Sequence, residues 1–123
     1  MQWDQLPVGL KSKLKGVLNM TLSELCKAIQ TRHLVRFYYN LDKEPGFRTV
    51  EPHMVARTKR GLLALSAWYL YGASESHEGQ GWRIYLLSGI SQVTILQDEF
   101  AGPRDSYKAD GGKSFHDVQC GLP

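Results

Sequence analysis

The sequence is poor in the features of secreted and membrane proteins. It has only two cysteines, Cys26 inside a predicted helix and Cys120 three residues from the end, and without a repeated spacing they predict no disulfide framework. Reduced thiols fit this pattern better. No apolar run approaches the roughly 20 residues of a membrane-spanning helix, and the N-terminus has no continuous apolar segment typical of a signal peptide. We therefore expect a cytoplasmic protein without a membrane partner.

Residues arranged for catalysis or metal binding are also scarce. Asp98 and Glu99 are adjacent at a predicted strand end, where side chains splay apart, so they form a poor acid-base pair. No nucleophile stands beside an obvious base. Glu75, His77 and Glu78 lack a spacing that would converge on one ion. We therefore expect a protein that is not an enzyme, with no catalytic residues, no metal site and no cofactor.

The charge of the chain is small but unevenly distributed. The 123 residues, 42% of them hydrophobic, suit one globular domain, and the net charge of +3 is too small to indicate nucleic-acid binding by itself. Residues 1–40 carry six basic and two acidic groups, residues 41–71 five and three, and residues 72–123 four and seven. A partner that carries phosphates would therefore approach the first part of the chain.

Two helical patterns open the chain. Residues 1–20 form an amphipathic segment in which leucines recur every four residues: Leu6, Leu10, Leu14 and Leu18. Because Pro7, Gly9 and Gly16 weaken a helix, we expect a partial helix that docks on the body or on another subunit. TLSE then predicts a capping box with Thr21 as the N-cap, followed by a helix over residues 22–32.

From His33 onward the hydrophobic period changes to two. Alternation predicts five strands, over residues 33–41, 47–57, 62–71, 82–87 and 90–96. Pro52 cannot donate to a ladder, so it should mark an edge or a bulge. We expect residues 101–123 to be irregular. One helix and five short strands predict a mainly β (α+β) protein, a small closed β-barrel preceded by a helix.

The stretch LSAWYLYG, residues 65–72, supports that barrel. In a strand Trp68 and Leu70 share one face while Tyr69 and Tyr71 share the other, so both faces need cover. The strand is therefore either enclosed in a barrel or lines a site that uses its aromatic side chains.

The order of motifs resembles the WYL domain, a bacterial family named for the tripeptide at residues 68–70. AIQTRHLVRFYY, RTVEPHMV, LSAWYL, WRIYLLSGI and ILQDEF follow one another as in the family. The resemblance spans residues 21–107, between the N-terminal segment and a tail at 108–123. It implies a five-stranded Sm-like, SH3-type barrel that senses a ligand or binds nucleic acid in regulation. The family's pocket positions fall on five residues: Tyr39, Arg48, His53, Tyr69 and Arg83.

The chain departs from the family where Ser88 and Gly89 replace an aspartate and an arginine, which weakens the expectation of strong phosphate binding. We expect a non-catalytic module that binds single-stranded nucleic acid or a small anionic, nucleotide-like effector. It should act through a partner. A DNA-binding winged helix needs on the order of 60 residues, and only about 20 precede the predicted helix.

The alternative function is a protein interaction or homo-oligomerisation module with a vestigial pocket. In that case Arg83 pairs with Glu51, the tyrosines fill the core and His53 is structural.

Overall fold

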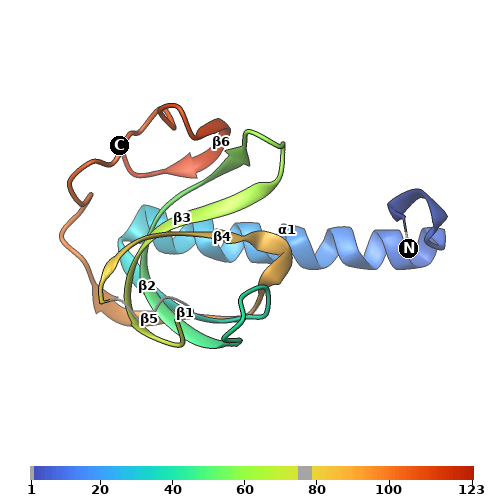
Figure 1. Cartoon of the computed structure of the whole chain (residues 1–123), viewed down its shortest axis with the longest axis horizontal. Helices are drawn as coiled ribbons and strands as arrows, with labels where there is room; N and C mark the ends of the chain where they lie inside the picture. Colours follow the sequence, from blue (N-terminus) through green and yellow to red (C-terminus); the bar gives the residue numbers. More distant parts are fainter. Residues whose placement is uncertain (1, 75–78) are drawn as a thin grey trace.

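The computed structural model describes residues 2–74 and 79–123 and contains one long helix and six strands (Figure 1). A short 3-10 helix, η1 (Trp3–Gln5), precedes α1 (Val8–Thr31). The strands are β1 (His33–Tyr39), β2 (Gly46–Thr58), β3 (Leu63–Gly72), β4 (Gly81–Leu86), β5 (Ile90–Glu99) and β6 (Phe115–Gly121). A second 3-10 helix, η2 (Leu87–Gly89), joins β4 to β5. The predicted mainly β architecture with an N-terminal helix is confirmed.

The sheet is antiparallel and is organised around β2. Its strand order is β4-β3-β2-β1-β5, and β6 also pairs with β2. The first part of β2 pairs with β1, with Val50 opposite Val35, and the last part pairs with β6, with Val55 opposite Cys120. A register shift against β3 falls between Pro52 and Met54. The bulge predicted at Pro52 is thus confirmed, since a residue without an N–H tolerates a break in the ladder.

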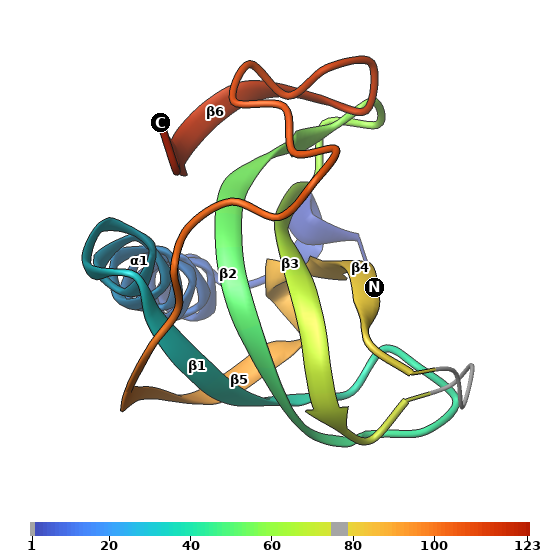
Figure 2. The ribbon, with the colours of Figure 1, turned by 90° about the vertical axis from the view of Figure 1, so that its left-hand side faces the viewer.

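The sheet is strongly curved but open (Figure 2). β4 and β5 lie at opposite ends of the strand order although only η2 separates them in the chain. Within the described residues no ladder joins these two strands. The predicted closed five-stranded barrel is therefore wrong. The sheet stays open where the chain leaves β4 through η2 instead of a hairpin, and the C-terminal residues add β6 as a sixth strand.

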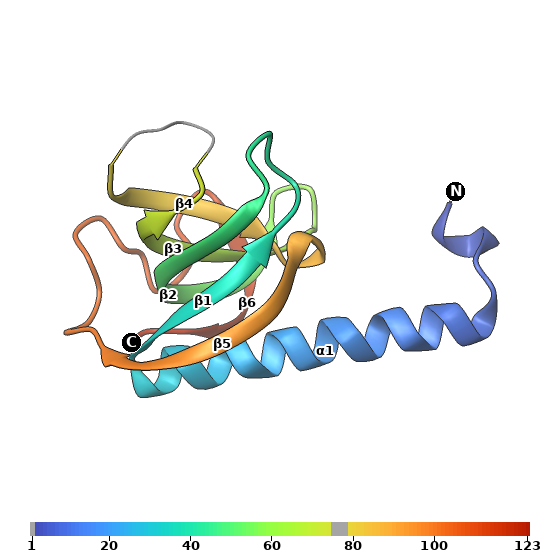
Figure 3. The ribbon, with the colours of Figure 1, turned by 90° about the horizontal axis from the view of Figure 1, so that it is seen from below.

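Helix α1 is continuous, so the predicted helix start at Thr21 is wrong. The hydroxyl of Thr21 donates to the carbonyl of Val17 at 3.1 Å, one turn earlier, as it does inside a helix. An exposed glycine such as Gly16 costs about 1 kcal/mol relative to alanine, which a 24-residue helix tolerates. The second half of α1 packs on the sheet and the first half projects from the body (Figure 3).

The C-terminal residues are ordered, contrary to the predicted irregular tail. They form β6, and a disulfide joins Cys120 of β6 to Cys26 of α1, with 5.7 Å between the Cα atoms. The prediction of reduced thiols is therefore wrong as well. Sequence reasoning missed both features because β6 exposes most of its side chains and so has no buried alternation, and because a pairing over 94 residues leaves no local pattern.

The core lies between the second half of α1 and the inner face of the sheet. Its fully buried side chains include Leu25, Ile29, Val35, Phe37, Val50 and Leu65. We define the inner face as the one that holds these side chains and the outer face as the opposite one.

Candidate functional site

Arg48 lies on the inner face and is 1% exposed. Its Nη2 donates to Asp42 Oδ2 at 2.8 Å and to the Glu44 carbonyl at 2.9 Å. Its Nη1 donates to the carbonyls of Gly46 at 3.1 Å and Tyr39 at 3.3 Å. The guanidinium is therefore satisfied by the turn between β1 and β2, and Arg48 holds that turn to the strands.

Buried tyrosines surround this guanidinium. Tyr39 and Tyr85 meet edge to face at 5.0 Å, and the Arg48 Cζ lies 5.2 Å and 5.9 Å from their ring centroids. The hydroxyl of Tyr39 accepts the N–H of Leu86 at 3.0 Å. Burial raises the pKa of both tyrosines, so they remain neutral and retain their hydroxyl protons well into the alkaline range.

Tyr69 and Arg83 form a second pair on the inner face. The Tyr69 ring is buried, its hydroxyl donates to the Gly72 carbonyl at 2.5 Å, and the Arg83 Cζ lies 5.2 Å from its centroid. Arg83 is partly exposed and donates to the carbonyls of Trp82 and Gly79. The predicted alternative, an ion pair between Arg83 and Glu51, is wrong, because Glu51 faces the outer side and pairs with Arg104.

His53 lies on the outer face, away from the inner-face arginines. Its ring packs against Trp82 at 4.7 Å, Tyr107 at 5.4 Å and Phe100 at 5.6 Å. Its Nε2 accepts the backbone N–H of Arg104 at 3.1 Å, so the ring proton is on Nδ1 and is donated to the Glu51 carbonyl at 2.9 Å. The structure thus brings four of the five predicted residues to one face and places His53 on the other.

Burial lowers the pKa of His53, which predicts acid-sensitive stability. Below about pH 6.5 the unfolded chain binds a proton that the folded chain resists, so the free energy of unfolding should fall as the pH falls from 7 toward the lowered folded-state pKa. Urea titrations between pH 7.5 and 5 test this. His53→Gln should flatten the slope, whereas His116→Gln, at an exposed position, should leave it unchanged. An unaltered slope in His53→Gln would assign the acid sensitivity to another group.

The tripeptide at residues 68–70 is divided between the two faces. Trp68 is half-buried on the outer face, where the Arg104 Cζ lies 4.8 Å from its ring and the Arg104 guanidinium holds Glu51 through bonds of 2.8 and 2.9 Å. Trp68 is therefore not enclosed by the core. It is covered by the segment that leads to β6.

A β-bulge at Leu70 changes the faces of the residues that follow it. Tyr69 pairs with Val50 and Tyr71 with Thr49, so Leu70 is the extra residue in β3. Tyr71 therefore lies on the outer face and is 60% exposed. The expectation that Tyr69 and Tyr71 share a face is wrong.

This bulge completes a group that sequence reasoning missed. The outer face of β1, β2 and β3 carries four side chains, which we call the aromatic ladder: Arg36, Tyr38, Phe47 and Tyr71. Tyr38 and Phe47 are directly opposite in register and meet edge to face at 5.3 Å. The Arg36 Cζ lies 3.8 Å from the Phe47 ring centroid. Tyr71 stands across from Thr49, the residue that faces Arg36 on the other side.

Other chemistry is sparse in the described part of the chain. Among residues 2–74 and 79–123 no three His, Cys, Asp or Glu side chains gather as metal ligands. Glu75, His77 and Glu78 lie outside the described residues. Over the same residues, no helix combines the length and the apolar character needed to cross a membrane.

Comparisons with known proteins agree with the motif order. A family model described as the WYL domain matches residues 20–95, more than half of the chain. A solved structure, that of Proteasome accessory factor B/C (PafBC) of Arthrobacter aurescens, is 19% identical and superposes with a TM-score of 0.57. The similarity covers 74% of this chain and 14% of that one, so it shows a shared fold over a small part of a longer protein. No curated protein matches the sequence.

Proposed function

We propose that this chain, which belongs to the WYL domain family, is a non-catalytic regulatory module that binds single-stranded nucleic acid or a nucleotide-like anion. The observation that carries this proposal is the aromatic ladder. Tyr71 exposes its ring on the strand surface, and the half-buried rings of Tyr38 and Phe47 lie beside the Arg36 guanidinium, so the ladder combines base stacking with phosphate contact.

The chemistry of the ladder suits a single strand better than a duplex. Stacking of a base on an aromatic side chain is worth about 1–3 kcal/mol, and it needs unpaired bases. Arg36 is exposed and presents a planar donor fork for a phosphate. The ladder also lies within residues 1–71, where basic groups exceed acidic ones.

The five residues taken from the family resemblance have different parts in this proposal. Arg83, whose guanidinium rests on the Tyr69 ring, lies on the inner face, so it is a separate anion contact and not part of the ladder. Tyr39 and Arg48 are buried and hold the turn between β1 and β2 in place. His53 is buried on the outer face and packs against Trp82, so its part is structural. We propose that the protein acts in the cytoplasm and that ligand binding changes the activity of a protein partner or of further domains.

Binding of a fluorescein-labelled oligothymidine strand, followed by anisotropy across a salt series, tests the ladder. Tyr71→Ala should weaken binding by about five- to a hundredfold, the loss of one stacked base. Arg36→Ala should instead reduce the dependence on salt, since it removes a phosphate contact. Val118→Ala, an exposed apolar residue on β6, is the matched control and should bind as the parent does. Equal affinity in Tyr71→Ala and the parent would reject the ladder as the site.

A second candidate function, self-association, is favoured by the projecting half of α1. Its apolar side chains are exposed on a helix that extends away from the body (Figure 3). They include Val8, Leu10, Leu14, Val17 and Met20. Leu10 and Leu14 lie on the same side of the helix as the buried Leu25. This side of α1 therefore continues as an exposed apolar surface beyond the body of the protein.

Light scattering tests this candidate. If α1 is a contact between copies, the parent should exceed the 13.9 kDa of one chain, and Leu10→Ser with Leu14→Ser should return it to that mass. Asn19→Ser, an exposed position on the opposite side of the helix, is the control. A parent that stays at one chain's mass at high concentration rejects homo-oligomerisation.

A further inference from the structure

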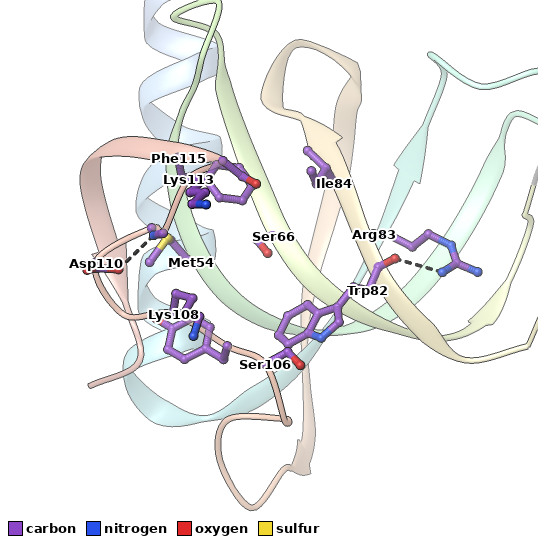
Figure 4. A pocket seen from close by; sticks show the side chains of 14 residues that line it. Met54, Ser66, Trp82, Arg83, Ile84, Ser106, Lys108, Asp110, Lys113 and Phe115 are labelled. Atoms are coloured by element: carbon purple, nitrogen blue, oxygen red, sulfur yellow. Dashed lines mark hydrogen bonds between the residues drawn. The ribbon is translucent and has the colours of Figure 1, made fainter.

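A cavity of about 920 Å³ lies between the outer face of β3 and β4 and the C-terminal segment that leads into β6 (Figure 4). This volume is typical of small-molecule sites. The strands contribute Met54, Ser66, Trp82 and Ile84, and the C-terminal segment contributes Ser106, Tyr107, Lys108 and residues 110–115. Arg83 borders the cavity, but its side chain points away from the other labelled side chains.

The walls of the cavity are mostly apolar. Met54, Trp82 and Ile84 face it from the sheet, and Tyr107 and Phe115 face it from the segment. Ile84 is 54% exposed although it stands within a strand, which leaves a branched apolar side chain in contact with water. A ligand with a flat apolar body would remove this surface from water.

The rim of the cavity is basic. Lys108 and Lys113 are exposed on two consecutive turns, and Asp110 between them accepts the N–H of Gly112 at 2.9 Å, so two ammonium groups stand against one carboxylate. The turns are fixed by hydrogen bonds from Gly111 to Lys108 and from Phe115 to Gly111. Gly111 has φ +91°, and a Cβ there would lie 2.5 Å from the Phe115 carbonyl oxygen, so only glycine fits.

We propose that this cavity binds a small organic anion, an aromatic carboxylate or sulfonate whose flat body contacts Trp82, Ile84 and Phe115 while its charged group meets Lys108 and Lys113. The site is separate from the aromatic ladder, and most of its lining lies beyond residues 20–95, the part that matches the family. It is therefore a second binding site, created by the C-terminal segment of this chain.

Two fluorescent probes of the same shape separate the two contributions. 8-Anilinonaphthalene-1-sulfonate carries the anionic group, and N-phenyl-1-naphthylamine lacks it. The sulfonate should bind at one saturable site, and Lys108→Met with Lys113→Met should weaken it about tenfold, as expected for two exposed charge pairs. The neutral probe should change less than twofold in that variant. Equal losses for both probes, or none, would overturn the anionic assignment.

Cavity-filling variants locate the probe. Ser66→Phe should abolish binding of both probes. If near-UV circular dichroism shows that this variant does not fold, Ile84→Trp, at a half-exposed position, fills the cavity instead. Val118→Trp, outside the cavity, should leave binding unchanged. Retained binding in a folded filled variant overturns the proposal. So does a concentration-dependent dimer that Ile84→Trp dissociates, because the cavity would then be an interface between copies.

Discussion

Reduction of the disulfide between Cys26 and Cys120 should lower the free energy of unfolding by about 4 to 5 kcal/mol. The bond closes a loop over 94 residues, and the loop-entropy estimate for a loop of roughly 100 residues is about 4.7 kcal/mol. This is a large part of the about 5–15 kcal/mol that is ordinary for a folded domain. Urea unfolding with and without a phosphine reductant measures it.

The double variant Cys26→Ser with Cys120→Ser is the control for this reduction. It should match the reduced parent and ignore the reductant. In a reducing cytoplasm the disulfide would be reduced. The free energy of unfolding of the reduced protein is therefore its stability in the compartment where we propose that it acts. The loss of stability should be largest at β6, which is also held by the exposed ion pair between Arg57 and Asp117. Amide hydrogen exchange in β6 should therefore become faster. Equal stability of the oxidised and reduced parent would contradict the account.

Replacement of Arg48 by alanine should destabilise the protein by about 3–5 kcal/mol, because it empties the space of a large, fully buried side chain and removes its hydrogen bonds. The variant leaves Asp42 and three backbone carbonyls without their donor and opens a space beside Tyr39 and Tyr85. Thermal and urea unfolding measure the loss.

Two further variants show whether the Arg48 guanidinium is the cause. Arg48→Lys should recover only part of the loss, because an ammonium cannot reproduce the planar fork. Arg60→Ala, at an exposed turn, should change the stability by less than about 0.5 kcal/mol. A cost below about 1 kcal/mol for Arg48→Ala would show that this network is not structural.

The strands of the sheet were predictable from their apolar and β-branched residues and the turns between them, and in β1 also from alternating burial. In β1 the exposed Arg36 stands between the buried Val35 and Phe37, whereas β2 is buried on both faces over residues 48–56, and Pro52 marks the bulge that its missing N–H permits. The boundary of α1 was not predictable in this way. A threonine followed by a glutamate reads as a capping box, but the same hydroxyl bonds the preceding turn when an upstream segment continues the helix.

The site was only partly predictable for a physical reason. Tyr39 and Arg48 could be selected by position, but their burial depends on the turn that packs over them. The aromatic ladder needs three strands in register and a bulge at Leu70 that turns Tyr71 outward, and neither is a local property of the sequence. Registers of this kind are set by tertiary packing.

Backbone amide shifts on titration with unlabelled oligothymidine show whether a single strand binds to the aromatic ladder, because they locate the bound strand on the protein. We expect the largest changes at Arg36, Tyr38, Phe47 and Tyr71, and we expect them to weaken as salt is added. Changes confined to the cavity beside Trp82, or an absence of change at concentrations that saturate a stacking site, would contradict binding at the ladder.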